Sequence, residues 1–474
     1  MSWLGDRTRG RMSRRLWGAA GGVIRGARMM LPTHGHPARV VVFGFATVIL
    51  VGTVLLMLPV SAENGQLTPW VTAVFTSTSA VCVTGLIVVD TPGHWSTFGE
   101  VVIMGLIQAG GLGIMTLASL LGLVVSRRLR LRVQRSAQTE TKTLDLGEVR
   151  RVVLGVISLS LIMEAATAVV LTMRMVHAYG YSWAHGSYLG VFHAISAFNN
   201  AGFALYPDSL MRYATDGWIC IPIVVAFVLG GLGFPVLFEI ARHLWARGYR
   251  RWSLHARITL LGYGMFALAG TVLITGLEWS NPATLGDFGT DGRLLVGMFH
   301  GLTPRTAGFN TLDVGEMHPA TLLVTDVLMF VGGGSAGTAG GIKVTTFALL
   351  AFVILAEARG EPQVHIAGRR ISNEVVRQAL TVVLVGVALV FLATLVLLML
   401  TPFGLDAVLF ESVSAFGTVG LSTGITGELP PLGELLLVVL MFTGRLGPIT
   451  LASALALRER GRRYDLPEER PIVG

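Results

Sequence analysis

The sequence STSAVCVTGL, from Ser77 to Leu86, is the first of four related segments in this chain. The others are HAISAFNNAGF at 193–203, HGLTPRTAGF at 300–309 and SVSAFGTVGL at 412–421. Each has a lead-in that contains Ser or Thr, then one glycine followed by an apolar residue. A second glycine-rich mark follows about 25 residues later, at 110–113, 230–233, 332–334 and 444–447. Two marks that recur in the same order, roughly 110 residues apart, indicate an internal fourfold repeat.

The composition indicates a membrane protein. Hydrophobic residues make up 52% of the 474 residues and charged residues only 14%, whereas soluble domains have about 25% charged residues. The apolar residues form runs of about 20 residues or more, which as helices cross roughly 30 Å of hydrocarbon. The two cysteines and eleven scattered histidines form neither a disulfide framework nor a metal-ligand spacing, so we expect no cofactor and no resident metal.

The apolar runs predict eight spanning helices, at 40–60, 101–125, 152–176, 218–244, 258–277, 320–355, 375–400 and 432–457. Between the two helices of each pair lies a segment too polar and too short to span, at 68–87, 186–204, 292–309 and 405–422. The pattern predicts an all-α polytopic membrane protein made of four helix–pore loop–helix repeats. Their expected bounds are 38–128, 129–246, 247–357 and 358–457, between terminal tails at 1–37 and 458–474.

The distribution of basic residues predicts the orientation. Lysine and arginine crowd both tails and the connections between repeats, whereas the stretches around the re-entrant segments hold only Arg174, Arg212, Arg293 and Arg305. By the positive-inside rule, both termini are cytoplasmic and all four re-entrant segments enter from outside. The net charge of +8 therefore reflects topology, and no nucleic-acid partner is expected. Repeats of the same topology are related by an axis along the membrane normal, which predicts a pseudo-fourfold arrangement around one pore.

The re-entrant segments have the composition of a cation filter. Non-helical backbone at membrane depth is tolerated only inside protein or along a watery cavity. Rings of main-chain carbonyl groups replace the water around K⁺ in potassium channels. Glycine adopts positive φ without a steric penalty, which lets successive carbonyls turn inward. The lead-in residues would form short pore helices whose negative C-terminal ends favour a cation.

Three of the segments resemble the filters of the Trk/Ktr/HKT potassium-transporter superfamily: SAFNNAGF at 196–203, PRTAGFNT at 304–311 and SAFGTVGLST at 414–423. The resemblance covers roughly residues 38–457. With eight expected spans and no additional N-terminal pair, the chain is more similar to the KtrB-type subunit than to TrkH. The resemblance implies a K⁺-selective, Na⁺-stimulated translocating subunit of the plasma (inner) membrane. It also implies a homodimer of monomeric pores above a cytoplasmic ring of nucleotide-binding KtrA-type subunits.

The resemblance assigns K⁺ binding to the glycine of each segment and the two residues before it. In the plant HKT branch, serine in the first filter goes with Na⁺ preference, so Gly85 favours K⁺ here. None of the four segments is a full TVGYG, and we expect such unequal walls to give looser selectivity than a tetrameric channel has. The assigned residues are Val83, Thr84, Gly85, Asn200, Ala201, Gly202, Thr306, Ala307, Gly308, Thr418, Val419 and Gly420.

The sixth expected helix is interrupted by GGGSAGTAGG. This run cannot hold an α-helix, since each glycine costs about 1 kcal/mol relative to alanine. Below the filter it would form a flexible loop across the pore, and the resemblance makes it an intramembrane gating loop; the alternative is close helix packing through small residues. Lys343 lies between Ile342 and Val344, so the run is not a nucleotide-binding Walker A motif. The loop residues are Gly332, Gly333, Gly334, Ser335, Ala336, Gly337, Thr338, Ala339, Gly340 and Gly341.

A few polar residues fall inside expected helices. Arg445 replaces a glycine of the fourth repeat's second mark, and the resemblance places it below the filter, against the gating loop, as a pore barrier. The alternative is a buried ion pair. For Glu164 we expect a structural or pairing role, while hydrogen bonding and an ion path are both open for Asp326. His193 and His300 are expected to lead into two pore helices as capping or packing residues.

The outer segments are acidic, which either concentrates cations at the mouth of the pore or makes an ordinary solvated face. Screening over about 8 Å limits the first effect. These residues are Asp90, Asp208, Asp216, Asp313, Glu316 and Glu428. The alternative function is a Trk-type K⁺ symporter coupled to H⁺ or Na⁺. A membrane enzyme would need a catalytic constellation, which the polar residues do not supply, so no enzymatic activity is expected.

Overall fold

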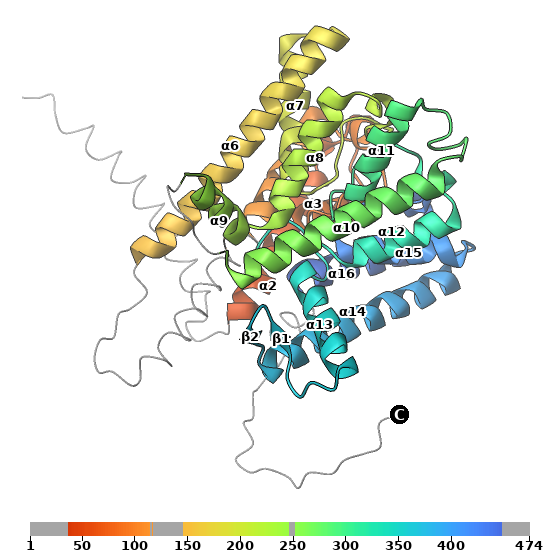
Figure 1. Cartoon of the computed structure of the whole chain (residues 1–474). Helices are drawn as coiled ribbons and strands as arrows, with labels where there is room; N and C mark the ends of the chain where they lie inside the picture. Colours follow the sequence, from red (N-terminus) through yellow and green to blue (C-terminus); the bar gives the residue numbers. More distant parts are fainter. Residues whose placement is uncertain (1–36, 114–115, 117–145, 246–251, 448–474) are drawn as a thin grey trace, which may run out of the picture. The chain divides into compact units, whose positions relative to one another are not determined.

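Figure 1 shows the computed structural model of the chain, which describes residues 37–113, 116, 146–245 and 252–447. The chain divides into two compact units, residues 1–44 with 450–474 and residues 45–449. Of the first unit, only residues 37–44, at the start of helix α2, lie in the described part. The predicted tails, at 1–37 and 458–474, fall outside it except for Pro37. The fold and the site below belong to the second unit.

The described elements repeat the order helix, pore helix, helix. The first repeat contains α2 (Pro37–Leu56), the pore helix α3 (Trp70–Val81), the short α4 (Thr91–His94) and the helix Thr97–Gly113. The second contains α6 (Leu146–Tyr179), the pore helix α7 (Trp183–Phe198), α8 (Gly217–Leu232) and α9 (Phe234–Trp245). The third contains α10 (Leu254–Glu278), the pore helix α11 (Thr290–Leu302), α12 (Pro319–Phe330) and α13 (Val344–Ala358). The fourth contains α14 (Asn373–Leu400), the pore helix α15 (Leu405–Gly417) and α16 (Pro431–Leu446).

Short elements complete the described part. Four 3₁₀ turns lie at Pro59–Ser61, Met211–Tyr213, Val314–Glu316 and Ile425–Glu428. Between the third and fourth repeats, strands β1 (His365–Ile366) and β2 (Arg369–Arg370) pair antiparallel, with Ile366 opposite Arg369. Ala367 and Gly368 join them with positive φ at both positions, which is the geometry of a two-residue type I′ hairpin turn.

The described residues contain four helices long and apolar enough to cross a membrane, in α2, α6, α10 and α14. The pair α8 and α9 makes a fifth candidate, bent by 107°. The unbroken helix expected at 218–244 is therefore wrong. The bend lies at Gly233, where φ is 90°, and the next amide, of Phe234, donates to the Ala336 carbonyl at 3.2 Å. In a straight helix the Phe234 amide would donate to a carbonyl of the same helix, whereas here it donates to a distant segment.

Each repeat contacts the next, and the last contacts the first. The second helix of one repeat packs against the pore helix of the following repeat in the pairs α8 with α11, α12 with α15, and α16 with α3. Between the first two repeats, Tyr188 of α7 donates to Glu100 of the helix Thr97–Gly113. Figure 1 shows α10, α12 and α15 side by side, and α12 packs against both of the others. The repeats therefore close into a ring, as the pseudo-fourfold prediction requires.

The second glycine marks bring these helices against the pore helices. A methyl group added to Gly110 would overlap the carbonyl oxygen of Val81, at the end of α3. One on Gly444 would overlap that of Phe416 in α15. One on Gly230 would overlap the carbonyl oxygen of Phe198, at the end of α7. Glycine is needed at these points because the backbones approach too closely for any side chain.

One predicted helix breaks where expected, and another ends earlier than expected. The sixth breaks between Phe330 and Val344, so the glycine-rich run does not hold a helix, as predicted. The eighth, α16, ends at Leu446, and Gly447 follows with φ 83°. Arg445 therefore lies in the last turn of α16 and not in the middle of a helix, and residues 448–457 of the predicted span fall outside the described part.

We expect Gly110→Ala to lower the melting temperature of the purified protein, because a new methyl group would force α3 and its neighbour apart at a cost of about 1–3 kcal/mol. Gly105→Ala is the matched control on the same helix, since nothing lies within 4 Å of a methyl group there. Thermal unfolding in detergent measures both variants. Equal melting temperatures for the two variants would contradict this packing.

Candidate functional site

The glycines of the four related segments form a closed ring. All have positive φ: 91° at Gly85, 71° at Gly202, 76° at Gly308 and 94° at Gly420. A methyl group on each would meet the carbonyl oxygen of the residue just before the glycine of the next repeat. In chain order these oxygens belong to Ala201, Ala307, Val419 and, closing the ring, Thr84. The structure thus brings together the four segments that the sequence analysis grouped and for which it predicted a filter.

The backbone alternates in handedness along each segment. The residue two before each glycine also has positive φ: 55° at Val83, 59° at Asn200, 68° at Thr306 and 51° at Thr418. Alternation of left-handed and right-handed residues turns successive carbonyl groups to the same side, the arrangement of a carbonyl-lined filter. Asparagine tolerates the left-handed region, whereas a β-branched residue there is strained by roughly 1–3 kcal/mol. The surrounding protein must therefore hold three of the four segments in place.

Hydroxyl groups on the pore helices supply part of that support. Ser79 accepts a hydrogen bond from the Gly85 amide at 3.0 Å and donates to the Leu86 carbonyl at 2.7 Å. In the other segments, the Ser196 hydroxyl donates to the Phe203 carbonyl and the Thr303 hydroxyl donates to the Phe309 carbonyl, while the Ser414 hydroxyl accepts from the Gly420 amide. This explains why every lead-in contains Ser or Thr. Each filter segment is hydrogen-bonded from behind by its own pore helix.

Buried carboxylates also support the filter region, and the sequence analysis missed the best example. Glu411 of α15 has 0% exposure and accepts hydrogen bonds from the loop after the fourth filter. Its donors are the Ser422 hydroxyl at 2.5 Å, the Thr423 amide at 3.0 Å and the Thr426 hydroxyl at 2.7 Å. Only the position of Glu411 inside an apolar pore helix could have signalled it. A carboxylate at that point accepts several donors at once and fixes the loop that leaves the filter.

Glu164 has the pairing role that was expected of it. Its carboxylate accepts from the side-chain amides of Gln108 and Asn199, both at 3.1 Å. Asn199 is the residue that caps the C-terminal end of α7. Glu164 therefore ties the second pore helix to the helix Thr97–Gly113 of the first repeat.

The glycine-rich run lies against one end of the filter. Gly334 and Thr338 donate their amides to the carbonyls of Gly231 and Gly230, at 2.8 and 3.1 Å. A methyl group on Gly340 would overlap the Thr418 hydroxyl, and one on Gly332 would lie 3.4 Å from the Thr306 side chain. The loop is thus closely packed and hydrogen-bonded in this structure.

Arg445 also lies against this loop. Its guanidinium group donates to the carbonyl oxygens of Thr338 and, at 3.5 Å, Gly110. The side chain is 4% exposed, and no carboxylate in the described part of the chain pairs with it. The resemblance placed it at this loop, and the structure does so too. The alternative of a buried ion pair has no acidic partner among the described residues.

Two further cations lie on the loop and were not assigned to it. Arg305, counted above among residues near the outer side, is completely buried; it lies 3.4 Å from the Gly332 carbonyl and over the Phe266 ring at 4.6 Å. Lys343 donates to the carbonyls of Ala339 and Gly340. The positive-inside rule counts arginines by their position along the chain and assigns none of them to a site. It therefore could not predict that Arg305 is buried near the end of a pore helix.

A cavity of about 390 Å³ opens at the other end of the filter. All four filter glycines line it, together with three of the expected acidic residues, Asp90, Asp208 and Asp313. Asp216, Glu316 and Glu428 are not among its lining residues. The ring of glycine segments therefore lies between an acidic cavity and a loop that three cationic side chains contact.

The two histidines lie inside the pore helices α7 and α11, and not before them as expected. The His193 ring accepts from the Leu205 amide at 3.3 Å, and the His300 ring from the Thr311 and Leu312 amides at 3.1 and 3.0 Å. Both rings hold the chain that leaves a filter. They are packing residues and not caps.

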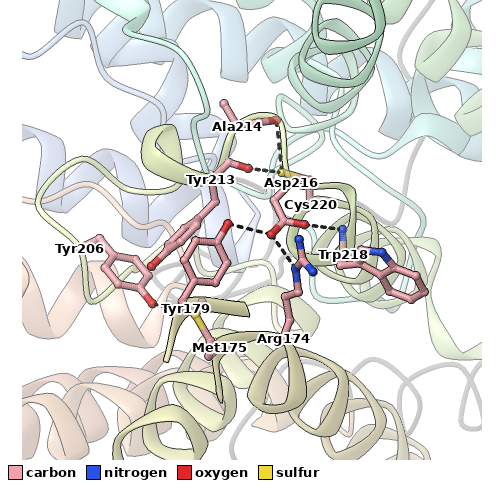
Figure 2. Close-up of polar contacts among 9 residues, drawn as sticks. All are labelled: Arg174, Met175, Tyr179, Tyr206, Tyr213, Ala214, Asp216, Trp218 and Cys220. Carbon is pink, nitrogen blue, oxygen red and sulfur yellow. Dashed lines mark hydrogen bonds and ion pairs between the residues drawn. The ribbon is translucent and has the colours of Figure 1, made fainter. Parts of the chain in front are cut away.

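Asp216 belongs to a separate cluster that fixes the start of α8 (Figure 2). It accepts from the Trp218 amide at 2.9 Å, pairs with Arg174 at 2.8 Å, and accepts from the Tyr179 hydroxyl at 2.8 Å. Figure 2 shows Tyr213 beside these residues, and its carbonyl accepts from the Cys220 thiol at 3.3 Å. Burial alone would raise the pKa of Asp216, but these hydrogen bonds outweigh it, so the pKa lies below its ordinary value.

Comparison with known proteins agrees with this geometry. Residues 39–461 match the family model described as TrkH: Cation transport protein. The chain belongs to the TrkH family. It is a multi-pass membrane protein of a cation-transport family, not of an enzyme family.

Its relatives in that family include the Ktr system potassium uptake protein B of Bacillus subtilis, which is 40% identical over 90% of this chain and 95% of the relative. The protein of the same name from Vibrio alginolyticus is 38% identical over 93% of this chain and 95% of that protein. The potassium/sodium uptake protein NtpJ of Enterococcus hirae is 33% identical over 92% and 97%. The crystal structure of the potassium transporter TrkH from Vibrio parahaemolyticus matches with TM-score 0.66 at 18% identity, over 87% of this chain and 85% of that chain, so it shows the shared fold.

We expect Gly420→Ala to reduce uptake of Rb⁺ by cells that depend on this protein at least about tenfold, because the new methyl group overlaps the Thr84 carbonyl and opens the ring. Gly65→Ala is the control: Gly65 also has positive φ, 65°, but nothing lies within 4 Å of an added methyl group. Equal reductions in the two variants would show that positive φ alone makes glycine necessary, and native uptake by Gly420→Ala would contradict the need for glycine in the ring.

The cluster around Asp216 predicts a pH dependence of stability. Because the pKa of Asp216 is lower in the folded protein than in the unfolded chain, its charge stabilises the fold above the ordinary aspartate pKa of about 3.9. That stabilisation is lost as the pH falls through the folded-state pKa. Asp216→Asn should lower the melting temperature at about pH 6, and the difference from the native protein should shrink as the pH falls below about 3.9. A difference that does not change with pH would contradict this role.

Proposed function

We propose that this chain is the K⁺-translocating subunit of a Ktr-type potassium uptake system. The observation that carries the proposal is the closed ring of four glycine segments, each with alternating backbone handedness. The relatives named Ktr system potassium uptake protein B, at 40% and 38% identity, support the choice of ion and system.

The filter would exchange the water around K⁺ for main-chain oxygens. The carbonyls that precede the glycines come from four segments around one axis and offer a cage without charged side chains. Pore-helix hydroxyls and buried carboxylates hold this cage at one width, so a smaller ion would lose water without gaining equally good contacts. In the first segment, Gly85 has no side-chain hydroxyl to replace a carbonyl, in keeping with the preference for K⁺ implied by the resemblance.

Cations would enter from the cavity that Asp90, Asp208 and Asp313 line. Flow would be passive and driven by the membrane potential, which is worth about 2.3 kcal/mol per charge for each 100 mV. At the other end, the 332–341 loop and Arg445 would obstruct the path until they move. Lys343 and Arg305 add two more positive charges to that barrier.

The remaining features of the proposal are carried over from the family. They are a homodimer in the plasma membrane, both termini in the cytoplasm, a ring of KtrA-type nucleotide-binding subunits beneath, and stimulation by Na⁺. The words "Ktr system" in the names of two relatives support the existence of a partner subunit. The basic connections between repeats support the orientation.

Rb⁺ uptake into liposomes that contain the purified protein tests the proposal. We expect uptake under an imposed inside-negative potential with no gradient of Na⁺ or H⁺. A variant lacking residues 335–337 should raise the initial rate at least about threefold, because losing even one hydrogen bond that holds the loop closed is worth about that factor. Liposomes without protein and liposomes with Gly420→Ala serve as controls. Uptake that requires a Na⁺ or H⁺ gradient would favour the Trk-type symporter instead.

A further inference from the structure

The Thr338 side chain, in the middle of the proposed gating loop, reaches the filter. Its hydroxyl lies 2.7 Å from the amide oxygen of Asn200, the residue two before the glycine of the second segment. A longer contact, 3.4 Å, joins the same hydroxyl to the Phe198 carbonyl at the end of α7. Thr338 and Asn200 are both completely buried, so water does not compete for either group.

The orientation of the Asn200 side chain follows from its other neighbours. Its NH₂ group faces two acceptors of the third segment, the Arg305 carbonyl at 3.4 Å and the Thr306 hydroxyl at 3.5 Å. A carbonyl oxygen only accepts hydrogen bonds, so the NH₂ group must point to it and the amide oxygen must point to Thr338. Asn200 therefore bridges the second filter segment, the third filter segment and the loop.

Gly230 keeps room for this bridge. A methyl group there would lie 2.8 Å from the Thr338 hydroxyl and 2.9 Å from the Asn200 amide oxygen. The Thr338 amide donates to the Gly230 carbonyl at 3.1 Å, and its carbonyl accepts from Arg445. The amide, hydroxyl and carbonyl groups of Thr338 thus form hydrogen bonds with α8, the second filter segment and Arg445, respectively.

The bridge exists in one wall of the filter only. The positions equivalent to Asn200 are Val83, Thr306 and Thr418, none of which has an amide side chain. In the described part of the chain, the second wall is therefore the one whose residue at this position bonds the loop through its side chain.

We propose that the Thr338 hydroxyl is a specificity-determining group of the filter, which positions Asn200 and through it the second and third filter segments. The inference rests on the proposed function of the ring as a K⁺ filter. The loop then does more than obstruct the path. When it lies against the filter it completes one wall, and when it withdraws it releases Asn200, so that ion preference and gating are linked through one hydrogen bond.

The test compares three variants in liposomes under an imposed potential, with Rb⁺ and Na⁺ fluxes measured separately. Thr338→Val keeps the shape of the side chain but removes the donor, and the flux ratio of Rb⁺ to Na⁺ should fall about three- to tenfold, the worth of one hydrogen bond. Thr338→Ser keeps the hydroxyl and should retain the native ratio. Ser335→Ala is the control on the same loop: among the described residues its hydroxyl bonds Thr345 alone, at 3.0 Å, and the ratio should stay native whatever the total flux becomes.

The outcomes separate the two proposals. If the native protein shows no potential-driven Rb⁺ flux, the proposed function fails. If the native protein conducts but Thr338→Val keeps the native ratio, the inference fails and the function stands. A change in total flux with an unchanged ratio would mean that Thr338 only holds the loop. Should Thr338→Val not fold, Thr338→Cys replaces it, because a thiol is a much weaker donor in nearly the same volume.

Discussion

Closure of the ring at Gly85, Gly202, Gly308 and Gly420 is the constraint on which the rest of the structure depends. At each glycine the backbone of one repeat comes so close to a carbonyl of the next that no side chain fits between them. Carbonyl groups turned toward one axis repel one another, and three of the positions beside them hold β-branched residues with positive φ. Such an arrangement persists only when the surrounding protein holds it.

The surrounding protein holds it in layers. Directly behind the filter, hydroxyls of the pore helices bond the segments that turn back from them, as Ser79 does. Behind those lie carboxylates such as Glu411 and Glu164, which accept several donors each. Farther out, the second glycine marks of the first, second and fourth repeats let a neighbouring helix pack against the carbonyl end of a pore helix. Glycine therefore serves conformational freedom in the filter and close approach at the second marks, which is why both recur in every repeat.

The parts predicted from the sequence are those marked by local patterns or by the family resemblance. The four segments, the break in the sixth helix and the contact between Arg445 and the loop follow from local patterns or from the resemblance. The errors arise where distant segments act on one another. The bend at Gly233 exists because the Ala336 carbonyl takes an amide of the next helix, and hydropathy along 218–244 carries no trace of that partner.

Predictions for charged residues fail for the same reason. Arg305 was counted with the outer residues because the positive-inside rule uses position along the chain and not burial. In the structure, two aromatic rings and a loop carbonyl surround it. In the sequence, Glu411 does not differ from other polar residues. In the structure, the loop at 422–426 folds back and donates hydrogen bonds to it. For both residues a tertiary contact, which the linear sequence does not show, decides the role.

The asymmetry among the repeats is the feature that a fourfold pattern alone would hide. The filter is nearly symmetric in its backbone, yet one wall carries Asn200 and one repeat contributes the loop that bonds it. A single chain with four unequal repeats can couple its filter to an internal loop at one point, which a ring of identical subunits would have to do at every subunit.

Locating the permeant ion would test the central claim most directly. Tl⁺ resembles K⁺ in size and scatters X-rays strongly, so crystals grown with Tl⁺ would give anomalous density wherever it binds. The account predicts a peak on the axis enclosed by Gly85, Gly202, Gly308 and Gly420, in contact with main-chain oxygens of all four segments. A transport-competent protein with no peak in this ring, or with Tl⁺ bound only elsewhere, would contradict the assignment of the filter.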